Sequence, residues 1–161
     1  MDTAKHVRSY ITRRLRANQQ KPPRVYDDIN TAVATRQKTA TTWPGNQTIS
    51  AEASLQLVER GVTRLDGQRV QFRHDPRLSW PSIQYMTTEQ VHGIYKDVQC
   101  PTALLLATNG WPFDSSLPRN KEGLELLQPR LQKTLPGSHH FHMDPDSAAA
   151  VAQEVMHFLE L

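Results

Sequence analysis

The 161-residue sequence has very little cysteine and no long hydrophobic run. Cys100 is its only cysteine, so neither an intrachain disulfide nor a cysteine-based zinc cluster can form, and a reducing compartment is expected. No stretch approaches the ~20 consecutive apolar residues that a transmembrane helix needs. The first residues show no apolar core followed by a small-residue cleavage site, so we expect no secretory signal. With 37% hydrophobic residues, the chain can still bury the core of one ordinary domain.

Positive charge is concentrated at the beginning of the chain. The net charge is +3, yet residues 1–24 carry seven basic side chains and one acid, whereas the rest is slightly acidic. Such a basic end is able to bind nucleic acid or an anionic membrane. It contains only one aromatic residue, Tyr10, and therefore lacks the stacking platforms of single-strand binders. We favour a solvated helix face, with no nucleic-acid partner and no stable membrane span.

Periodicity and capping signals predict a helix-rich first half. Val7, Ile11 and Leu15 lie four residues apart and predict a helix over residues 4–18. Residues 24–48 are polar, with a turn at Trp43-Pro44-Gly45-Asn46. Ser50 as N-cap and Gly61 as the C′ residue predict a second helix. The pair Asp66-Gly67 predicts a hairpin with a type I′ turn.

The second half has the alternation typical of an α/β domain. A helix is expected from Thr87, because Gln90 stands at capping-box spacing. The continuously apolar residues 102–107 predict a strand buried on both faces, as in a parallel sheet. A helix over 120–128, a weaker strand over 130–135 and a last helix follow, the last with Asp144 as N-cap. Two strands do not make a stable sheet with both faces covered, so part of the fold is missing from this sequence.

Three histidines follow the weaker strand, at positions 139, 140 and 142. One interpretation is a metal site, although adjacent residues of an extended chain point to opposite sides and the nearby Asp144 and Asp146 are placed to start the last helix. A second is a histidine-rich surface loop. A third is that one histidine takes a proton from a nucleophile, since in α/β hydrolases the histidine comes last along the chain.

The sequence resembles a known family over roughly residues 50–161. The segments LVERGVTRLDG…FRHDPRLSW (57–80), CPTALLLATNGWPFDSS (100–116) and LPGSHHFHMD (135–144) carry the resemblance. They are similar to the cap and C-terminal part of α/β hydrolases, most closely the serine hydrolase-like proteins. The implied fold class is α/β, a partial α/β-hydrolase fold, with a helical cap portion over residues 1–90 and the last two strands and helices of the core over 91–161.

The resemblance also implies roles for individual residues. His139, the first histidine after the Gly-Ser pair, matches the catalytic base. Asp114 is the nearest candidate for the acid, although Thr108-Asn109-Gly110 stands where the family pattern places an aspartate. Trp43, Trp80 and Tyr85 are candidates to line an acyl pocket or simply to pack in the cap. The implied reaction is hydrolysis of a small ester-like substrate, with neither metal nor organic cofactor, and the implied compartment is the cytoplasm, or the peroxisome as in some family members.

The sequence departs from the family in one essential respect, because it contains no G-x-S-x-G motif. Ser115, Ser116 and Ser138 are the serines nearest the expected site, and none lies between glycines at a strand-to-helix turn. Cys100 precedes the expected strand, at the wrong end for catalysis, and reads as a small buried hydrophobe. We therefore expect the chain to be inactive alone, prone to aggregate, and able to associate with the missing N-terminal half. The alternative is a non-catalytic truncated product that acts as an interaction or basic binding module.

Overall fold

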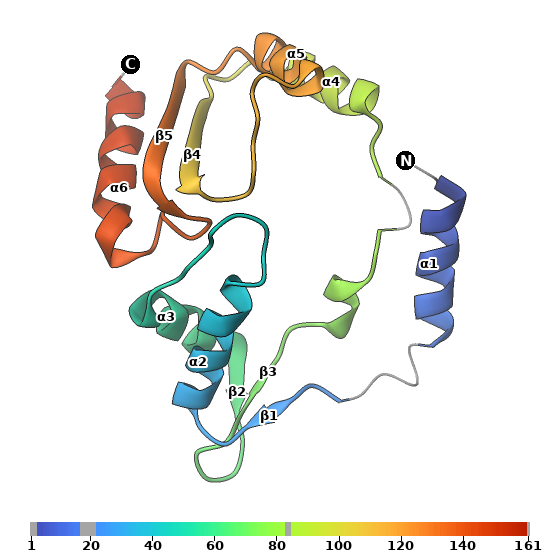
Figure 1. Ribbon diagram of the computed structural model, residues 1–161, viewed down its shortest axis with the longest axis vertical. Coiled ribbons are helices and arrows are strands. Elements are labelled where there is room, and N and C mark those ends of the chain that lie inside the picture. Colours follow the sequence, from blue (N-terminus) through green and yellow to red (C-terminus); the bar gives the residue numbers. More distant parts are fainter. Residues whose placement is uncertain (1–2, 17–21, 83–84, 161) are drawn as a thin grey trace.

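The structure is a computed structural model that describes residues 3–16, 22–82 and 85–160 (Figure 1). Its elements in chain order are α1 (Thr3–Leu15), β1 (Val25–Tyr26), α2 (Ile29–Ala40), α3 (Ala51–Gly61), β2 (Val62–Arg64), β3 (Val70–Phe72), the 3-10 helix η2 (Pro76–Ser79), α4 (Thr88–Asp97), β4 (Ala103–Asn109), α5 (Pro118–Leu127), β5 (Leu131–Ser138) and α6 (Pro145–Glu160). The strands form a small antiparallel sheet of order β1-β3-β2 and a parallel pair, β4-β5.

The antiparallel sheet and the helices α2 and α3 share one hydrophobic core. Val58 of α3 and Val70 of β3 are completely buried, and Tyr26 of β1 packs edge-on against the ring of Phe72. These residues belong to one cluster with Ala32 and Val33 of α2. The part of the chain expected to be a cap therefore has a packed interior of its own.

Helix α2 lies in residues 24–48, for which the sequence indicated only a polar segment with a turn, so this helix was not predicted. Asp28 is its N-cap, and its carboxylate accepts a hydrogen bond of 2.7 Å from the amide of Thr31. Threonines and other polar residues occupy much of the helix, so its apolar face is too narrow to give a clear periodic signal. Packing against α3 and the sheet, rather than intrinsic propensity, stabilises α2.

The hairpin is present, but its turn is not type I′. β2 and β3 pair antiparallel, with Arg64 opposite Val70, and the amide of Leu65 donates to the carbonyl of Arg69. A type I′ turn requires positive φ at both central residues, and here Gly67 has φ +70° whereas Asp66 has no positive φ. The loop is therefore longer and uses only the glycine in the left-handed region.

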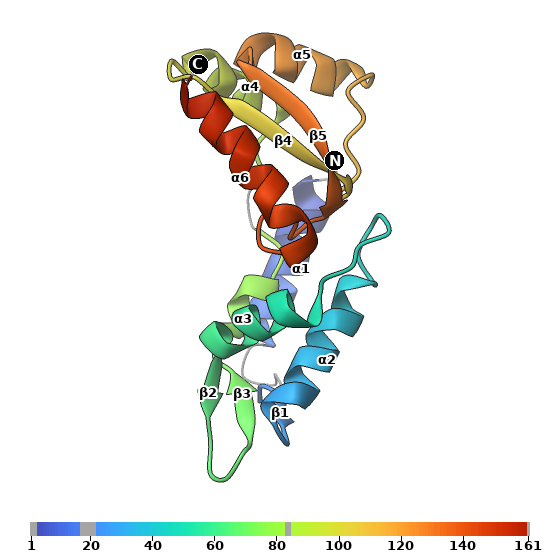
Figure 2. The ribbon, with the colours of Figure 1, turned by 90° about the vertical axis from the view of Figure 1, so that its left-hand side faces the viewer.

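The parallel pair β4-β5 corresponds to the two strands that the sequence predicted in the second half of the chain. β5 runs from Leu131 to Ser138, longer than expected, and α6 runs along the two strands (Figure 2). α4 begins with the expected capping box between Thr87 and Gln90. The expectation that β4 is buried on both faces was wrong, because its central residues are only half-buried and its ends are exposed. β4 has a hydrogen-bonded neighbour on one side alone among the described strands.

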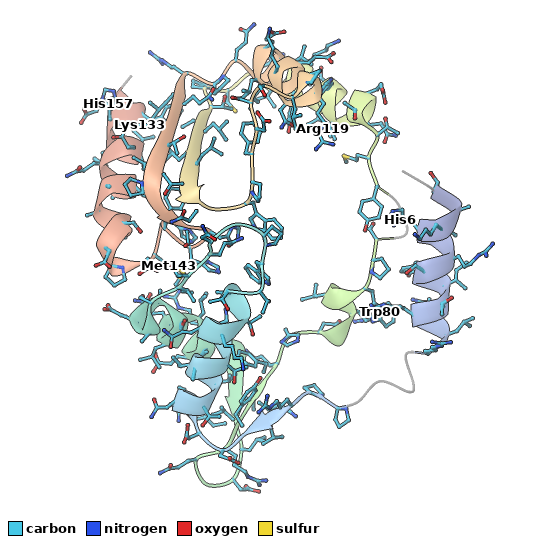
Figure 3. The ribbon with its side chains drawn as sticks, viewed as in Figure 1. His6, Trp80, Arg119, Lys133, Met143 and His157 are labelled. Carbon is cyan, nitrogen blue, oxygen red and sulfur yellow. The ribbon has the colours of Figure 1, made fainter. Side chains whose placement is uncertain are left out.

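Helix α1 stands apart from both cores. It ends at Leu15, earlier than expected, and positions 17–18 of the expected helix lie outside the described residues. None of its residues is buried; its rings contact the segment that leads from η2 to α4 (Figure 3). His6 lies 4.7 Å from the ring of Tyr85, and Tyr10 lies 6.3 Å from that of Trp80. No helix in the described ranges is both long and apolar enough to cross a membrane.

Candidate active site

Three loops meet at the carboxyl ends of β4 and β5. They are the cap loop (residues 41–50) between α2 and α3, the loop after β4, and the histidine loop (residues 139–144) after β5. Trp43 of the cap loop stacks on Trp111, with ring centroids 6.1 Å apart and an interplanar angle of 28°. The ring of His139 lies edge-on to both, 6.0 Å from Trp43 and 6.3 Å from Trp111. His139 is itself exposed, so two tryptophans flank a histidine that solvent can reach.

The cap loop approaches the loop after β4 so closely that a side chain does not fit between them. Gly45 has φ +85°, and a Cβ atom at this position would lie 2.6 Å from the carbonyl oxygen of Gly110. Only glycine adopts this backbone conformation without strain and leaves room for the contact. Gly45 therefore holds Trp43 next to Trp111.

Hydrogen bonds and apolar packing fix the segment from α2 to α3 against the neighbours of His139. The amide of Thr48 donates to Oγ of Ser138 at 2.8 Å, and the amide of Ser50 donates to Oδ2 of Asp144 at 3.1 Å. Met143, labelled in Figure 3, packs against a buried cluster of Ala40, Ile49 and Ala53. These contacts hold both sides of His139 and leave its ring without a hydrogen-bonded partner among the described residues.

The histidine loop is compact rather than extended. Gly137 has φ +132°, and the amides of Phe141 and Met143 donate to the carbonyls of Ser138 and His140 in two successive turns. Oγ of Ser147, at the start of α6, donates to the carbonyl of Phe141 at 2.8 Å. The turns place His139, His140 and His142 in different surroundings, so they are not equivalent.

His140 is held by Arg36 of α2. Nη2 of Arg36 lies 3.1 Å from Nε2 of His140 and can only donate, so Nε2 is the acceptor and the proton of the neutral ring is on Nδ1. Burial lowers the pKa of His140 from 6.5 to about 4, and the charge of Arg36 acts in the same direction. Because its Nε2 is occupied and its ring stays neutral, His140 is poorly suited to accept a proton from a nucleophile.

Asp114 lies on the loop after β4, but its carboxylate is engaged locally. Oδ1 accepts from the amide of Ser116 at 2.8 Å and from its hydroxyl at 2.6 Å. These hydrogen bonds lower the pKa of Asp114, which is therefore ionised. Among the described residues no hydrogen bond joins Asp114 to His139, so the assignment of the acid stays a prediction.

The remaining candidate residues lie in several environments. Ser138 is buried and accepts from Thr48, while Ser115 and Ser116 are exposed on the loop after β4; none stands at a strand-to-helix turn. Trp80 and Tyr85 contact α1 rather than the meeting point of the three loops. Cys100 is exposed, so the expectation that it is a buried hydrophobe was wrong. It lies before β4 in an open segment, where no packing covers it.

In the part of the chain that the structure describes, no group of three or more His, Cys, Asp or Glu side chains is placed to bind a metal ion. Arg36 and Trp111 are the two contributors to the site that the sequence did not suggest. Arg36 lies in residues 24–48, which the sequence showed only to be polar with a turn, and no short-range pattern connects it to a histidine 104 residues later.

The chain is similar to known proteins over most of its length. No protein-family model matches the chain. A serine hydrolase-like protein of Dictyostelium discoideum is 29% identical over 126 residues, which cover 71% of this chain and 34% of that protein. The solved structure of the hypothetical protein PA1622 from Pseudomonas aeruginosa PAO1 is 29% identical with a TM-score of 0.81, and the match covers 99% of this chain and 53% of that one. The thioesterase domain from the curacin biosynthetic pathway, at 20% identity, has a TM-score of 0.61 and is covered to 50%.

The fold and these matches define the class: the chain is related to the α/β hydrolases and has a partial α/β-hydrolase fold. Within that class it is similar to a serine hydrolase-like protein. The chain spans about a third of the curated relative and about half of the solved structures.

Proposed function

We propose that this chain is the C-terminal half of a serine hydrolase that acts on small ester-like substrates. The observation that carries the proposal is the exposed, unbonded ring of His139 between Trp43 and Trp111, at the carboxyl ends of β4 and β5. In an α/β sheet, loops at this edge carry the catalytic groups. The nucleophile belongs to polypeptide outside this sequence, because the chain has no G-x-S-x-G motif.

In this mechanism His139 acts twice. It takes the proton of the attacking serine hydroxyl as the serine oxygen bonds to the ester carbonyl, and it then gives that proton to the departing alkoxide. Water repeats the cycle on the acyl-enzyme and releases the acid. In this mechanism the carboxylate of Asp114 releases its hydrogen bonds from Ser116 and accepts one from the ring of His139 instead. That hydrogen bond orients the imidazole.

The outer edge of β4 is the proposed docking edge for the half that carries the nucleophile. The seven residues of β4, ALLLATN, include neither a charge nor a proline, whereas β5 contains Lys133 and Pro136, which discourage pairing at a sheet edge. Beside β4, a cavity of about 260 Å³ opens between α4 and α5, lined partly by Leu104, Leu124 and Leu127. An unguarded apolar strand next to an open apolar cavity favours the addition of a further strand.

The test starts from the native protein, isolated from its source with an antibody against this chain and treated with a fluorophosphonate probe, which labels activated serines. We expect a mass above 18.3 kDa and a labelled serine in a G-x-S-x-G sequence outside these 161 residues. A native mass of 18.3 kDa without labelling and without a co-purifying front half contradicts the proposal and favours a non-catalytic product.

The role of His139 is tested in the labelled protein or complex. His139→Gln should slow fluorophosphonate labelling by at least about 100-fold, the usual contribution of a general base. His142→Gln is the matched control, because it removes a histidine from the same loop. Equal effects of the two substitutions contradict the assignment of His139.

A further inference from the structure

A cavity between α2, α3 and β3 is lined by basic side chains and by no acidic one. It measures about 390 Å³. Arg36, Arg73 and His74 provide its polar groups, and Leu57, Gly61 and Phe72 provide its apolar surface. A cavity with two guanidinium groups over an apolar floor has the chemistry of a site for an anion attached to an apolar body.

Arg36 is a half-buried cation without a carboxylate partner in the described part of the chain. Burial lowers its pKa, which means that its charge is incompletely solvated. One of its five N–H groups is directed at His140, and its guanidinium carbon lies 5.4 Å from the centroid of the Trp43 ring. Several donors therefore remain available for a ligand.

Arg73, the second guanidinium of the cavity, also has no ion pair with an acid among the described residues. Its Nη2 donates to the carbonyl of Arg60. Asp75 interacts electrostatically with His74 at the cavity, and its carboxylate accepts hydrogen bonds from Nε and Nη2 of Arg77. Neither guanidinium of the cavity forms an ion pair with an acid among the described residues.

We propose that this cavity binds the carboxylate of a small acid with an apolar body, held by Arg36 and Arg73 and packed on Leu57 and Phe72. Together with the function proposed above, on which this step rests, the cavity implies a substrate ester whose acyl part carries such an acidic group. Arg36 joins the cavity to His140, whose ring centroid is 4.9 Å from that of His139. The cavity is thus connected through Arg36 to the loop that carries the exposed imidazole of His139.

The test is a titration of the full 161-residue chain, kept dilute, with benzoate and separately with benzyl alcohol as its uncharged analogue. Trp43 lies against Arg36, so its fluorescence reports occupancy of the cavity. We expect saturable binding of benzoate and none of benzyl alcohol. Arg36→Gln and Arg73→Gln should each weaken binding by about tenfold or more, since a hydrogen bond to a charged group contributes about 1.5–3 kcal/mol.

Arg64→Gln is the matched control, because it removes the same charge from β2 without touching the cavity. The proposal is overturned by absence of saturable benzoate binding, by equal binding of benzyl alcohol, by equal weakening in Arg64→Gln, or by inorganic phosphate binding as tightly as benzoate. Arg73 is exposed, so Arg73→Gln should fold even where Arg36→Gln does not. Binding needs no serine, so this result is independent of whether the labelling experiment supports hydrolase activity.

Discussion

Arg36 and His140 are 104 residues apart in the sequence, yet their side chains lie 3.1 Å apart, from Nη2 to Nε2. The contact joins the cap helix α2 to the loop after the last strand. It also distinguishes two adjacent histidines, because His140 is held neutral while His139 keeps an exposed ring between two tryptophans. Helix α2 is thus part of the candidate site.

The depressed pKa of His140 predicts a stability that depends on pH. Its folded-state value is about 4 against an ordinary 6.5, so between these two values the unfolded chain binds more protons than the folded one. The free energy of unfolding therefore decreases as the pH falls from 6.5 to about 4. His140→Gln should flatten this decrease in urea titrations, and His157→Gln, on the exposed side of α6, should not. An unchanged slope in His140→Gln contradicts the assignment.

Substitution of Arg36 should raise the pKa of His140. Because the positive charge of Arg36 disfavours the imidazolium of His140, Arg36→Gln should raise the pKa of His140, although burial continues to hold it below the ordinary value. The measurement is an NMR titration of the histidine ring signals. Arg64→Gln serves as the control, and a pKa of His140 that falls or stays constant in Arg36→Gln rules out this electrostatic coupling.

The hydrogen bond between Thr48 and Ser138 should contribute measurably to stability. Ser138 is only 5% exposed, so Ser138→Ala leaves the amide of Thr48 without its acceptor. We expect a loss of about 1–3 kcal/mol in the free energy of unfolding, the usual range for a buried unsatisfied donor. Ser115→Ala, at an exposed position, should change it little. If Ser138→Ala and Ser115→Ala change thermal stability equally, the hydrogen bond between Thr48 and Ser138 does not stabilise the contact between the α2–α3 loop and the end of β5.

Replacing Gly45 by alanine should destabilise the chain more than replacing Gly67, although both glycines have positive φ. Gly67→Ala meets no atom within 4 Å and suffers only from its backbone conformation, at about 1 kcal/mol or somewhat more. Gly45→Ala adds a collision with the carbonyl of Gly110 and should destabilise the chain further, while separating Trp43 from Trp111. Denaturation and tryptophan fluorescence measure the two effects. Identical losses for both variants contradict the close approach of the two loops.

The unguarded edge of β4 should make the isolated chain self-associate as its concentration rises. Ala103→Lys places a charge at an exposed position of that edge and should reduce association, because edge charges oppose strand pairing. Sedimentation velocity at increasing concentration measures the change. Gln132→Lys adds the same charge to β5, which already carries Lys133, and should have a weaker effect. A monomeric wild-type chain at all concentrations shows that the edge is protected.

Local signals predicted several elements well because their causes are local. The capping box of Thr87 and Gln90, the N-cap Ser50 and the apolar run of β4 are each specified by neighbouring residues, and each is where the sequence placed it. α2 was missed because its stability comes from packing with α3 and the sheet rather than from periodicity. The type I′ turn was wrong because strand register, rather than the Asp66-Gly67 pair, sets the loop length.

By itself the sequence determined most of the strands and helices from residue 50 onward, the histidine loop, the relationship to α/β hydrolases and the absence of a nucleophile motif, all of which depend on residues that are adjacent or regularly spaced. Only the tertiary structure decided which histidine is free, because that depends on Arg36 from a distant helix. It likewise decided that Trp43 and Trp111 flank His139 and that Arg36 and Arg73 line one cavity. The physical reason is that these contacts arise where separate loops converge, and no short-range pattern records which loops will meet.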